Sequence, residues 1–129
     1  MEFEQLKLDP RILAAIKQAG FHQATRIQQE AIPIVLSGKD LMASAQTGTG
    51  KTAAFVLPLL QRIKAGGRKP TALIVTPKRE LALQIEGVAK QASRFTQHRV
   101  AVVYGGVGYG PQAVALRRGV DVLVATPGR

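Results

Sequence analysis

The stretch Ala45-Gln46-Thr47-Gly48-Thr49-Gly50-Lys51-Thr52 is the pattern from which the fold follows. It joins a glycine-rich turn to a lysine and a hydroxyl, between an apolar run at 41–45 and a helical pattern at 52–63. A strand, such a loop and a helix, in that order, form the P-loop unit of α/β domains. We therefore expect a short buried strand over 41–45, a phosphate-binding loop over 45–52 and a helix over 52–63.

The residue types of this loop suit a nucleoside triphosphate. Gly48 and Gly50 can adopt positive φ, so that successive N–H groups point into one concavity at a helix start. Lys51 and Thr52 are the candidate catalytic residues, with the lysine on the outer phosphates and the hydroxyl as a Mg²⁺ ligand. Ala45 stands where the strict pattern has glycine, which requires an ordinary backbone conformation there. The alternative is a glycine-rich turn that caps a helix beside an exposed lysine.

Length and composition indicate one domain with a core. The chain has 129 residues, 46% of them hydrophobic, and no cysteine for disulfides or thiolate metal sites. No apolar run approaches the roughly 20 residues that cross a bilayer, and the start lacks the apolar core of a signal peptide. We therefore expect a cytoplasmic protein without a membrane partner.

The net charge of +10 is unevenly distributed. Residues 1–40 hold five basic and five acidic residues, whereas residues 41–129 hold thirteen basic residues and three acidic ones. Such a surplus suits a polyanion such as nucleic acid, although a charge excess alone is more often a solubility feature. The position of the basic residues has to decide between the two explanations.

Local signals predict two helices before the loop. Asp9-Pro10 is an N-cap followed by a proline at the first helical position, and Gly20 is the expected stop. A second helix is expected over 27–36, with its end at Ser37-Gly38.

Three continuous apolar runs after the loop predict strands, over 71–76, 100–104 and 120–125. Continuous patterns are typical of strands buried on both faces. Helical patterns over 80–94 and 111–118 separate these runs, which implies crossover connections. The expected fold is α/β, with a parallel sheet flanked by helices.

The loops after the predicted strands gather unusual residues. In a parallel sheet these loops meet at one edge, where α/β proteins bind ligands. The loops are 46–50, 77–79, 105–106 and 126–129. Arg79 and Arg129 could bind phosphodiester groups, and helix starts nearby offer N–H groups to anions. For any single loop, turn-forming residues with solvated charges are an equally good explanation.

No acidic residue is a good partner for Mg²⁺. Asp40 and Asp121 precede strands, so about five residues at roughly 3.3 Å each separate them from the phosphate edge. Glu80 lies at that edge, but the helix dipole explains an acid in a first helical turn. His22 and His98 have no partner at metal-ligand spacing. We assign none of these residues a catalytic role.

Five motifs in a fixed order resemble those of the N-terminal RecA-like domain of DEAD-box RNA helicases. They are the Q motif at 20–28 with Phe3 as its upstream aromatic residue, motif I at 45–52, motif Ia at 77–82, the GG element at 105–106 and motif Ib at 126–129. The resemblance covers residues 1–129, a partial RecA-like domain with 1–40 as the Q-motif region and 41–129 as the P-loop and RNA-facing core.

The resemblance implies ATP with Mg²⁺ as cofactors and RNA as a partner. It implies nucleotide contacts from Phe3, Phe21, Arg26, Gln28, Ala45, Gln46, Thr47, Gly48, Thr49, Gly50, Lys51 and Thr52, with Thr52 on the metal. It implies single-stranded RNA contacts from Pro77, Arg79, Gly105, Gly106, Thr126, Pro127, Gly128 and Arg129. Gln28 would read the adenine edge and Phe3 would stack on the base. From the residues alone, Phe3 could instead anchor a loose end, Gln28 could lie on an exposed helix face, and Thr25 could cap a helix.

Two departures from the family pattern qualify these implications. Lys78 stands at the usual Thr of motif Ia, where it could add a phosphate contact or remove a backbone contact of the hydroxyl. The chain also lacks the Asp-Glu-Ala-Asp and Ser-Ala-Thr motifs and a second RecA-like domain. We therefore expect this fragment of an ATP-dependent RNA helicase to bind nucleotide and RNA without hydrolysis or unwinding. The alternatives are a fragment of a related DNA helicase and a non-catalytic nucleotide- or RNA-binding module.

Overall fold

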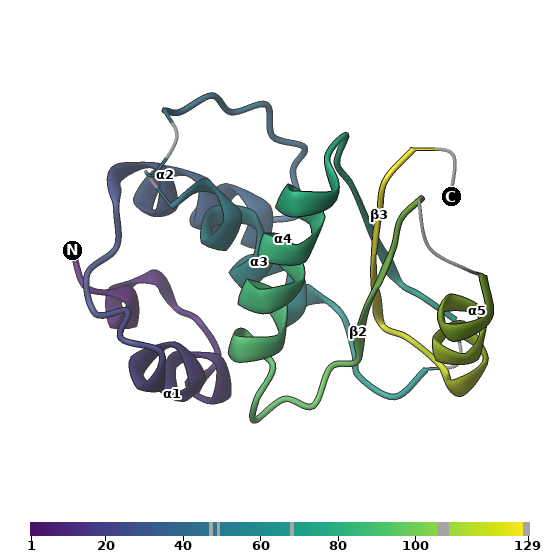
Figure 1. Cartoon of the computed structure of the whole chain (residues 1–129). Coiled ribbons are helices and arrows are strands. Elements are labelled where there is room, and N and C mark those ends of the chain that lie inside the picture. Colours follow the sequence, from purple (N-terminus) through teal and green to yellow (C-terminus); the bar gives the residue numbers. More distant parts are fainter. Residues whose placement is uncertain (47, 49, 68, 106–108, 128–129) are drawn as a thin grey trace.

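The computed structural model describes residues 1–129 except 47, 49, 68, 106–108 and 128–129. In chain order its elements are the 3-10 helix η1 (Phe3–Leu6), α1 (Pro10–Gln18), α2 (Arg26–Leu36), α3 (Lys51–Arg62), β1 (Ala72–Val75), α4 (Arg79–Ala92), β2 (Val100–Val103), α5 (Tyr109–Arg118) and β3 (Val122–Ala125). Figure 1 shows α1, α2 and α3 on one side, the sheet with α5 on the other, and α4 between them.

The three strands form a parallel sheet in the order β1-β3-β2. Val122 of β3 pairs with Ala72 of β1 and with Val100 of β2, and the register continues to the strand ends. Helix α4 connects β1 to β2, and α5 connects β2 to β3. The predicted α/β fold with crossover helices is confirmed.

The two faces of this sheet are buried to different extents. Ala72, Val122 and Val124 are buried in one core with side chains of α3 and α4 such as Leu57. On the other face, Leu73 is 63% and Val75 62% exposed. The expectation that every strand is buried on both faces is therefore wrong for β1. Helix α5 packs against β2 and leaves this side of β1 open.

The predicted strand over 41–45 is wrong. Residues 41–46 form an irregular loop that arches past α2 (Figure 1), and Met42 is 100% exposed. A strand requires a neighbour for its N–H and C=O groups, and no described strand pairs with this segment. Its apolar sequence therefore fixes neither its secondary structure nor its burial.

The predicted capping signals of α1 and α2 are confirmed. The Asp9 carboxylate accepts a hydrogen bond from Arg11 N–H (2.8 Å) at the start of α1, and Gly20 beyond its end has φ 93°. Thr25 caps α2, which begins one residue before the expected 27–36 range. Within the described residues, no helix is long and apolar enough to cross a membrane.

Candidate nucleotide site and RNA-facing edge

The backbone of the P-loop has the predicted form. Gly48 and Gly50 have φ of 84° and 85°, a region that L side chains rarely adopt. Ala45 is not among the described residues with positive φ, so alanine is compatible with its place in the loop. Gly50 is the N-cap of α3, and no side chain caps this helix start. The loop therefore ends at an open N-terminus of a 12-residue helix, which favours an anion.

A cleft of about 590 Å³ opens in front of this helix start. It is lined by Gly48, Gly50, Lys51, Thr52, Ala53 and Phe55, by Phe21 and Gln28 from the Q-motif region, and by Leu81, Gln84, Ile85 and Val88 of α4. Lys51 is exposed and Thr52 half-buried. The candidate catalytic lysine and metal-binding hydroxyl therefore lie on one open cleft.

Gln28 connects α2 to the P-loop. Its side-chain oxygen accepts a hydrogen bond from Thr25 N–H (2.9 Å), and its Nε2 donates to the Gly50 carbonyl (3.2 Å). Thr25 Oγ1 accepts in return from Gln28 N–H (3.4 Å), which completes a capping box. Because Gln28 is 3% exposed, it does not lie on an exposed helix face. An adenine edge would have to take over one of these hydrogen bonds.

Phe3 and Phe21, both predicted nucleotide contacts, differ in exposure. Phe3 is 3% exposed and packs in the core with Leu6 and Ile16, whereas stacking on adenine needs an open ring face. Phe21 is 38% exposed and lines the cleft.

The remaining nucleotide candidates lie at the side of the loop. Arg26 forms an exposed ion pair with Glu30 (3.2 Å). Gln46 and Ala45 line a second hollow, of about 630 Å³, together with Arg26. The predictions for Thr47 and Thr49 lie outside the described residues.

The carboxyl ends of the strands bring three predicted RNA loops together. Thr76 N–H donates to the Ala125 carbonyl, and Thr126 N–H donates to the Val103 carbonyl, each at 3.0 Å. These bonds align the loops that begin at Pro77, Tyr104 and Thr126. Pro77, Gly105 and Pro127 are exposed and Thr126 is half-buried, whereas Gly106, Gly128 and Arg129 lie outside the described residues.

Tyr104 is a residue of this edge that the sequence did not single out. The Arg79 guanidinium lies 4.4 Å from the centroid of its ring. The Gln112 amide of α5 donates a hydrogen bond to the Tyr104 carbonyl (3.0 Å). The sequence feature that could have pointed to Tyr104 is its position as an aromatic residue directly before Gly105. Its contact with Arg79 spans 25 positions and therefore depends on the fold.

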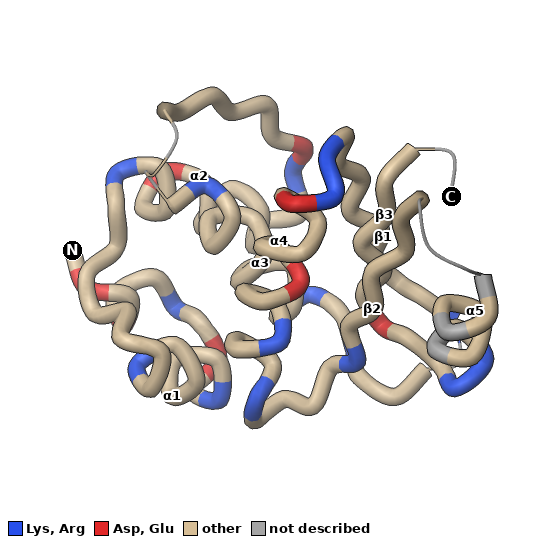
Figure 2. Tube along the Cα trace, viewed as in Figure 1, with Lys and Arg blue, Asp and Glu red and all other residues tan. Residues whose placement is uncertain are grey.

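The P-loop does not continue a strand of this sheet, contrary to expectation, and faces α4 instead. Helix α4 starts at Arg79 on the candidate RNA-facing edge, and four of its residues line the candidate nucleotide cleft: Leu81, Gln84, Ile85 and Val88. Figure 2 shows the basic segment at this helix start. One helix therefore links the two candidate sites.

Carboxylates do not complete a metal site in the described part of the chain, which holds no cluster of three or more potential His, Cys, Asp or Glu ligands. Asp121 lies directly before β3, far from the carboxyl edge, as expected. Glu80 lies in the first turn of α4, consistent with its dipole role. Thr52 remains the candidate Mg²⁺ ligand.

Comparison with known proteins gives a consistent result. The family model described as DEAD/DEAH box helicase matches residues 25–129. The chain is 44% identical to "ATP-dependent RNA helicase DeaD" of Mycobacterium tuberculosis H37Rv, covering 98% of this chain and 23% of that protein. It is 43% identical to "ATP-dependent RNA helicase CshA" of Limosilactobacillus reuteri, covering 100% and 26%. It thus spans about a quarter of the length of these relatives.

A solved structure gives the same answer for the fold. The crystal structure of a DEAD box protein from the hyperthermophile Methanococcus jannaschii superposes with a TM-score of 0.93 at 38% sequence identity, covering 100% of this chain and 35% of that one. The parallel sheet with its flanking helices is therefore part of a RecA-like domain. Together with the family match over residues 25–129, this shows that the chain belongs to the DEAD/DEAH box helicase family.

Proposed function

We propose that this chain is the nucleotide- and RNA-binding part of an ATP-dependent RNA helicase. The observation that carries the proposal is the uncapped start of α3, where two positive-φ glycines and Lys51 face one cleft. Phosphates would bind at this helix start and Mg²⁺ at the Thr52 hydroxyl. Gln28 lines the same cleft, and its amide would bind the adenine edge in place of its hydrogen bond to Thr25 or to Gly50.

The second part of the proposal is single-stranded RNA at the carboxyl edge of the sheet. Arg79 supplies a cation there, the exposed Pro77 and Gly105 leave room for a backbone, and the start of α4 offers N–H groups. ATP hydrolysis and unwinding are proposed for the whole protein, with a second RecA-like domain closing over both ligands. A cytoplasmic location is part of the same proposal.

Replacement of Lys51 by methionine is expected to weaken ADP binding by about 30-fold or more, because a charge-assisted contact to phosphate is lost. Isothermal titration with ADP and GDP measures the effect. Lys39→Met, which removes an exposed lysine outside the cleft, is the control and should bind ADP normally. Unchanged ADP affinity in Lys51→Met would refute the nucleotide site. Equal affinity of the unchanged protein for ADP and GDP would refute adenine recognition.

Replacement of Arg79 by alanine is expected to weaken binding of a short single-stranded RNA about fivefold, because one phosphate contact disappears. The slope of log affinity against log salt should fall by about 0.7, the value for one contact to a single strand. Fluorescence anisotropy with a labelled oligonucleotide between 50 and 200 mM salt, about the range over which such contacts respond, measures both quantities. Lys39→Ala is the control. An Arg79→Ala variant with unaltered affinity and slope would remove this residue from the RNA path.

A further inference from the structure

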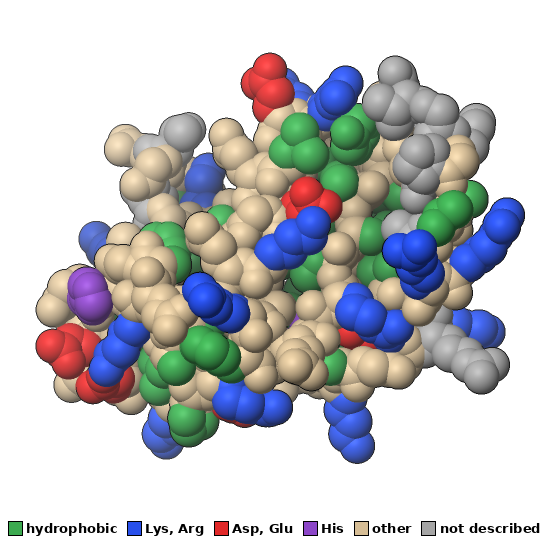
Figure 3. Space-filling model, turned by 60° about the horizontal axis from the view of Figure 1, so that its bottom comes forward, with side chains coloured by type: hydrophobic (Ala, Val, Ile, Leu, Met, Phe, Trp, Pro, Cys, Tyr) green, Lys and Arg blue, Asp and Glu red, His purple; other side chains and the backbone are tan. Residues whose placement is uncertain are grey.

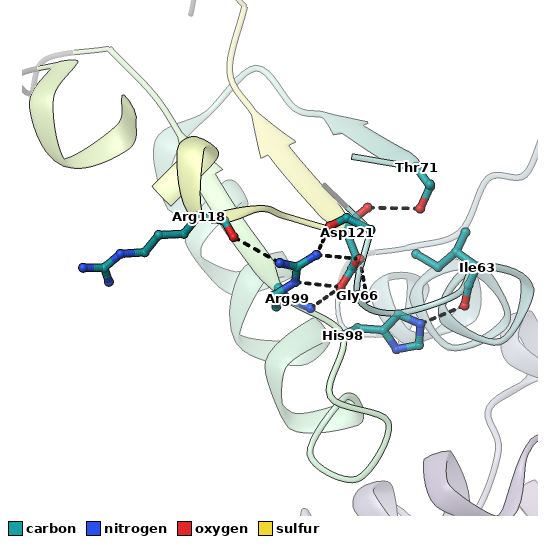
Figure 4. A network of polar contacts seen from close by, with 8 residues as sticks. Ile63, Gly66, Thr71, His98, Arg99, Arg118 and Asp121 are labelled. Atoms are coloured by element: carbon teal, nitrogen blue, oxygen red, sulfur yellow. Dashed lines mark hydrogen bonds and ion pairs between the residues drawn. The ribbon is translucent and has the colours of Figure 1, made fainter. Parts of the chain in front are cut away.

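An ion pair with a fully buried carboxylate organises the end of the sheet opposite to the candidate RNA-facing edge (Figure 4). Asp121 is 0% exposed, and its carboxylate accepts hydrogen bonds from Arg99 N–H (2.7 Å) and Gly66 N–H (3.1 Å). The Arg99 guanidinium pairs with this carboxylate and donates to the carbonyls of Arg118 (3.2 Å) and Gly67. One pair of residues therefore fixes the start of β3, the start of β2, the end of α5 and the loop after α3.

His98 extends this network to the end of α3. Its Nε2 lies 2.8 Å from the Ile63 carbonyl, and its Nδ1 lies 2.7 Å from Thr96 Oγ1. The chain segments that surround these anchors are 62–71, 93–99 and 116–121. All of them lie at the amino ends of the three strands, so their relative positions are fixed by contacts between residues distant in sequence.

Exposed basic side chains gather on these segments, and we call them the basic face. They are Arg62, Lys64, Lys69, Arg94, Arg117 and Arg118. None of the six forms an ion pair within the described residues. The acidic residue of these segments is Asp121, which is buried and paired with Arg99. Figure 3 shows this side of the molecule, where Lys and Arg side chains (blue) outnumber Asp and Glu side chains (red).

Helix dipoles explain only part of this charge. Arg62 lies in the last turn of α3, and Arg117 and Arg118 lie in that of α5, where a cation stabilises the final carbonyls. Lys64 and Lys69 lie beyond the helices, where the dipole effect has fallen off. Gathered on one rigid frame, like charges repel each other, and a bound polyanion relieves this repulsion. Six of the thirteen basic residues after residue 40 thus belong to the basic face.

An aromatic side chain indicates which polyanion fits. Phe95 is 41% exposed, and the Arg94 guanidinium lies 5.9 Å from the centroid of its ring. Exposed aromatic rings among cations provide stacking platforms for unpaired bases. Cations bind phosphates without reading sequence. The combination fits single-stranded RNA bound without sequence preference.

We propose that the basic face is a second, sequence-independent surface for single-stranded RNA, on the opposite end of the sheet from Arg79. Helix α4 separates the two surfaces, and its 14 residues span about 21 Å at 1.5 Å each. An RNA of about 8 nucleotides, within the usual site size for single strands, is long enough to fill one of these surfaces. A longer strand would contact both and gain affinity from the second contact.

Nuclear magnetic resonance mapping on the 129-residue chain tests this proposal. Titration with an RNA of about 8 nucleotides should shift amide signals of residues 94–99 and 117–121 in addition to those near Arg79. In the triple variant Arg94→Gln/Arg117→Gln/Arg118→Gln, the shifts of residues 94–99 and 117–121 should disappear. The shifts near Arg79 should remain. The affinity of this triple variant for an RNA of about 30 nucleotides should fall about tenfold. Its slope of log affinity against log salt should fall by about 2, because three phosphate contacts are lost. Phe95→Ala should weaken binding several-fold with an unchanged slope.

The matched control is Lys7→Gln/Arg11→Gln/Lys39→Gln, which removes the same charge from the first 40 residues. An equal loss of RNA affinity in the control, or no amide shifts on the basic face, would overturn the proposal. Stronger shifts of the same signals with polyglutamate or with phosphatidylserine vesicles than with RNA would also overturn it. The site at Arg79 is judged separately: its failure would abolish the effect of Arg79→Ala and leave the shifts on the basic face.

Discussion

Replacement of Gly50 by alanine is expected to lower both the stability of the protein and its affinity for ADP, although the change adds one methyl group. Gly50 has φ 85°, so any L side chain strains the backbone there. A Cβ atom would also collide with Gln28 Nε2 and lie 3.2 Å from Thr25 Oγ1. The methyl group therefore competes with the hydrogen bond from Gln28 to the loop and with the capping box of α2.

The expected size follows from these separate contributions. The left-handed conformation costs about 1–2 kcal/mol for a residue with a Cβ. Loss of the capping interaction and of one hydrogen bond adds about 1–2 kcal/mol. A total of about 2–4 kcal/mol is a large fraction of the roughly 5–15 kcal/mol that stabilise a domain. Displacement of Gln28 from the cleft should also reduce the preference for ADP over GDP.

Gly48 provides a matched control for the same substitution. Its φ is 84°, but a Cβ there would meet no atom of the described residues within 4 Å, its chain neighbours apart. Gly48→Ala should therefore show the backbone strain without displacing Gln28. Thermal unfolding and titration of both variants separate the two effects. Equal losses in the two variants would show that the contact with Gln28 contributes nothing beyond strain.

Local signals predicted the elements that local chemistry determines. Thr25 and Asp9 cap helices because their side chains accept hydrogen bonds from N–H groups two or three residues later. Gly48 and Gly50 adopt positive φ because the turn into α3 requires it. These interactions involve residues close in the chain, so a single sequence contains all the information that they need.

The predictions that were wrong depend on contacts between residues that are far apart in the sequence. Residues 41–45 are as apolar as β1, but a strand forms only beside a hydrogen-bonding neighbour, which local sequence does not supply. Val75 belongs to an apolar run and is exposed because α5 lies against β2 instead. Phe3 is buried by tertiary packing that its position near the N-terminus did not reveal.

The structural role of Asp121 could not be predicted from the sequence either. The sequence pattern correctly indicates that Asp121 lies away from the phosphate edge, but its partners Arg99 and Gly66 are 22 and 55 positions away. The isolated His98 likewise has a structural role through the carbonyl of Ile63. Charge counting detected the basic surplus, whereas only the fold shows that much of it surrounds this network.

Replacement of Asp121 by alanine is expected to destabilise the protein by about 3 kcal/mol at neutral pH, because it leaves Arg99 and two N–H groups without their buried acceptor. This value lies at the lower end for a broken buried pair, since the Arg99 side chain is 38% exposed and can reach water. Urea unfolding measures the change. Asp121→Asn retains an acceptor without the charge and should lose less, while Asp40→Ala, at an exposed carboxylate, is the control.

Because of the Asp121 carboxylate, we expect the free energy of unfolding to depend on pH. Burial raises the pKa of Asp121, but hydrogen bonds from Arg99, its positive charge and the Gly66 N–H outweigh burial and place the pKa below its ordinary value. A carboxyl group with a lowered pKa in the folded state stabilises the protein above its unfolded pKa of about 3.9, and the contribution is lost as pH falls through the folded value. The difference in unfolding free energy between the unchanged protein and Asp121→Ala should therefore be constant from about pH 7 to pH 5 and shrink below about pH 4. A difference that stays constant down to pH 2, or that grows on acidification, would show that the charge of Asp121 does not hold these segments together.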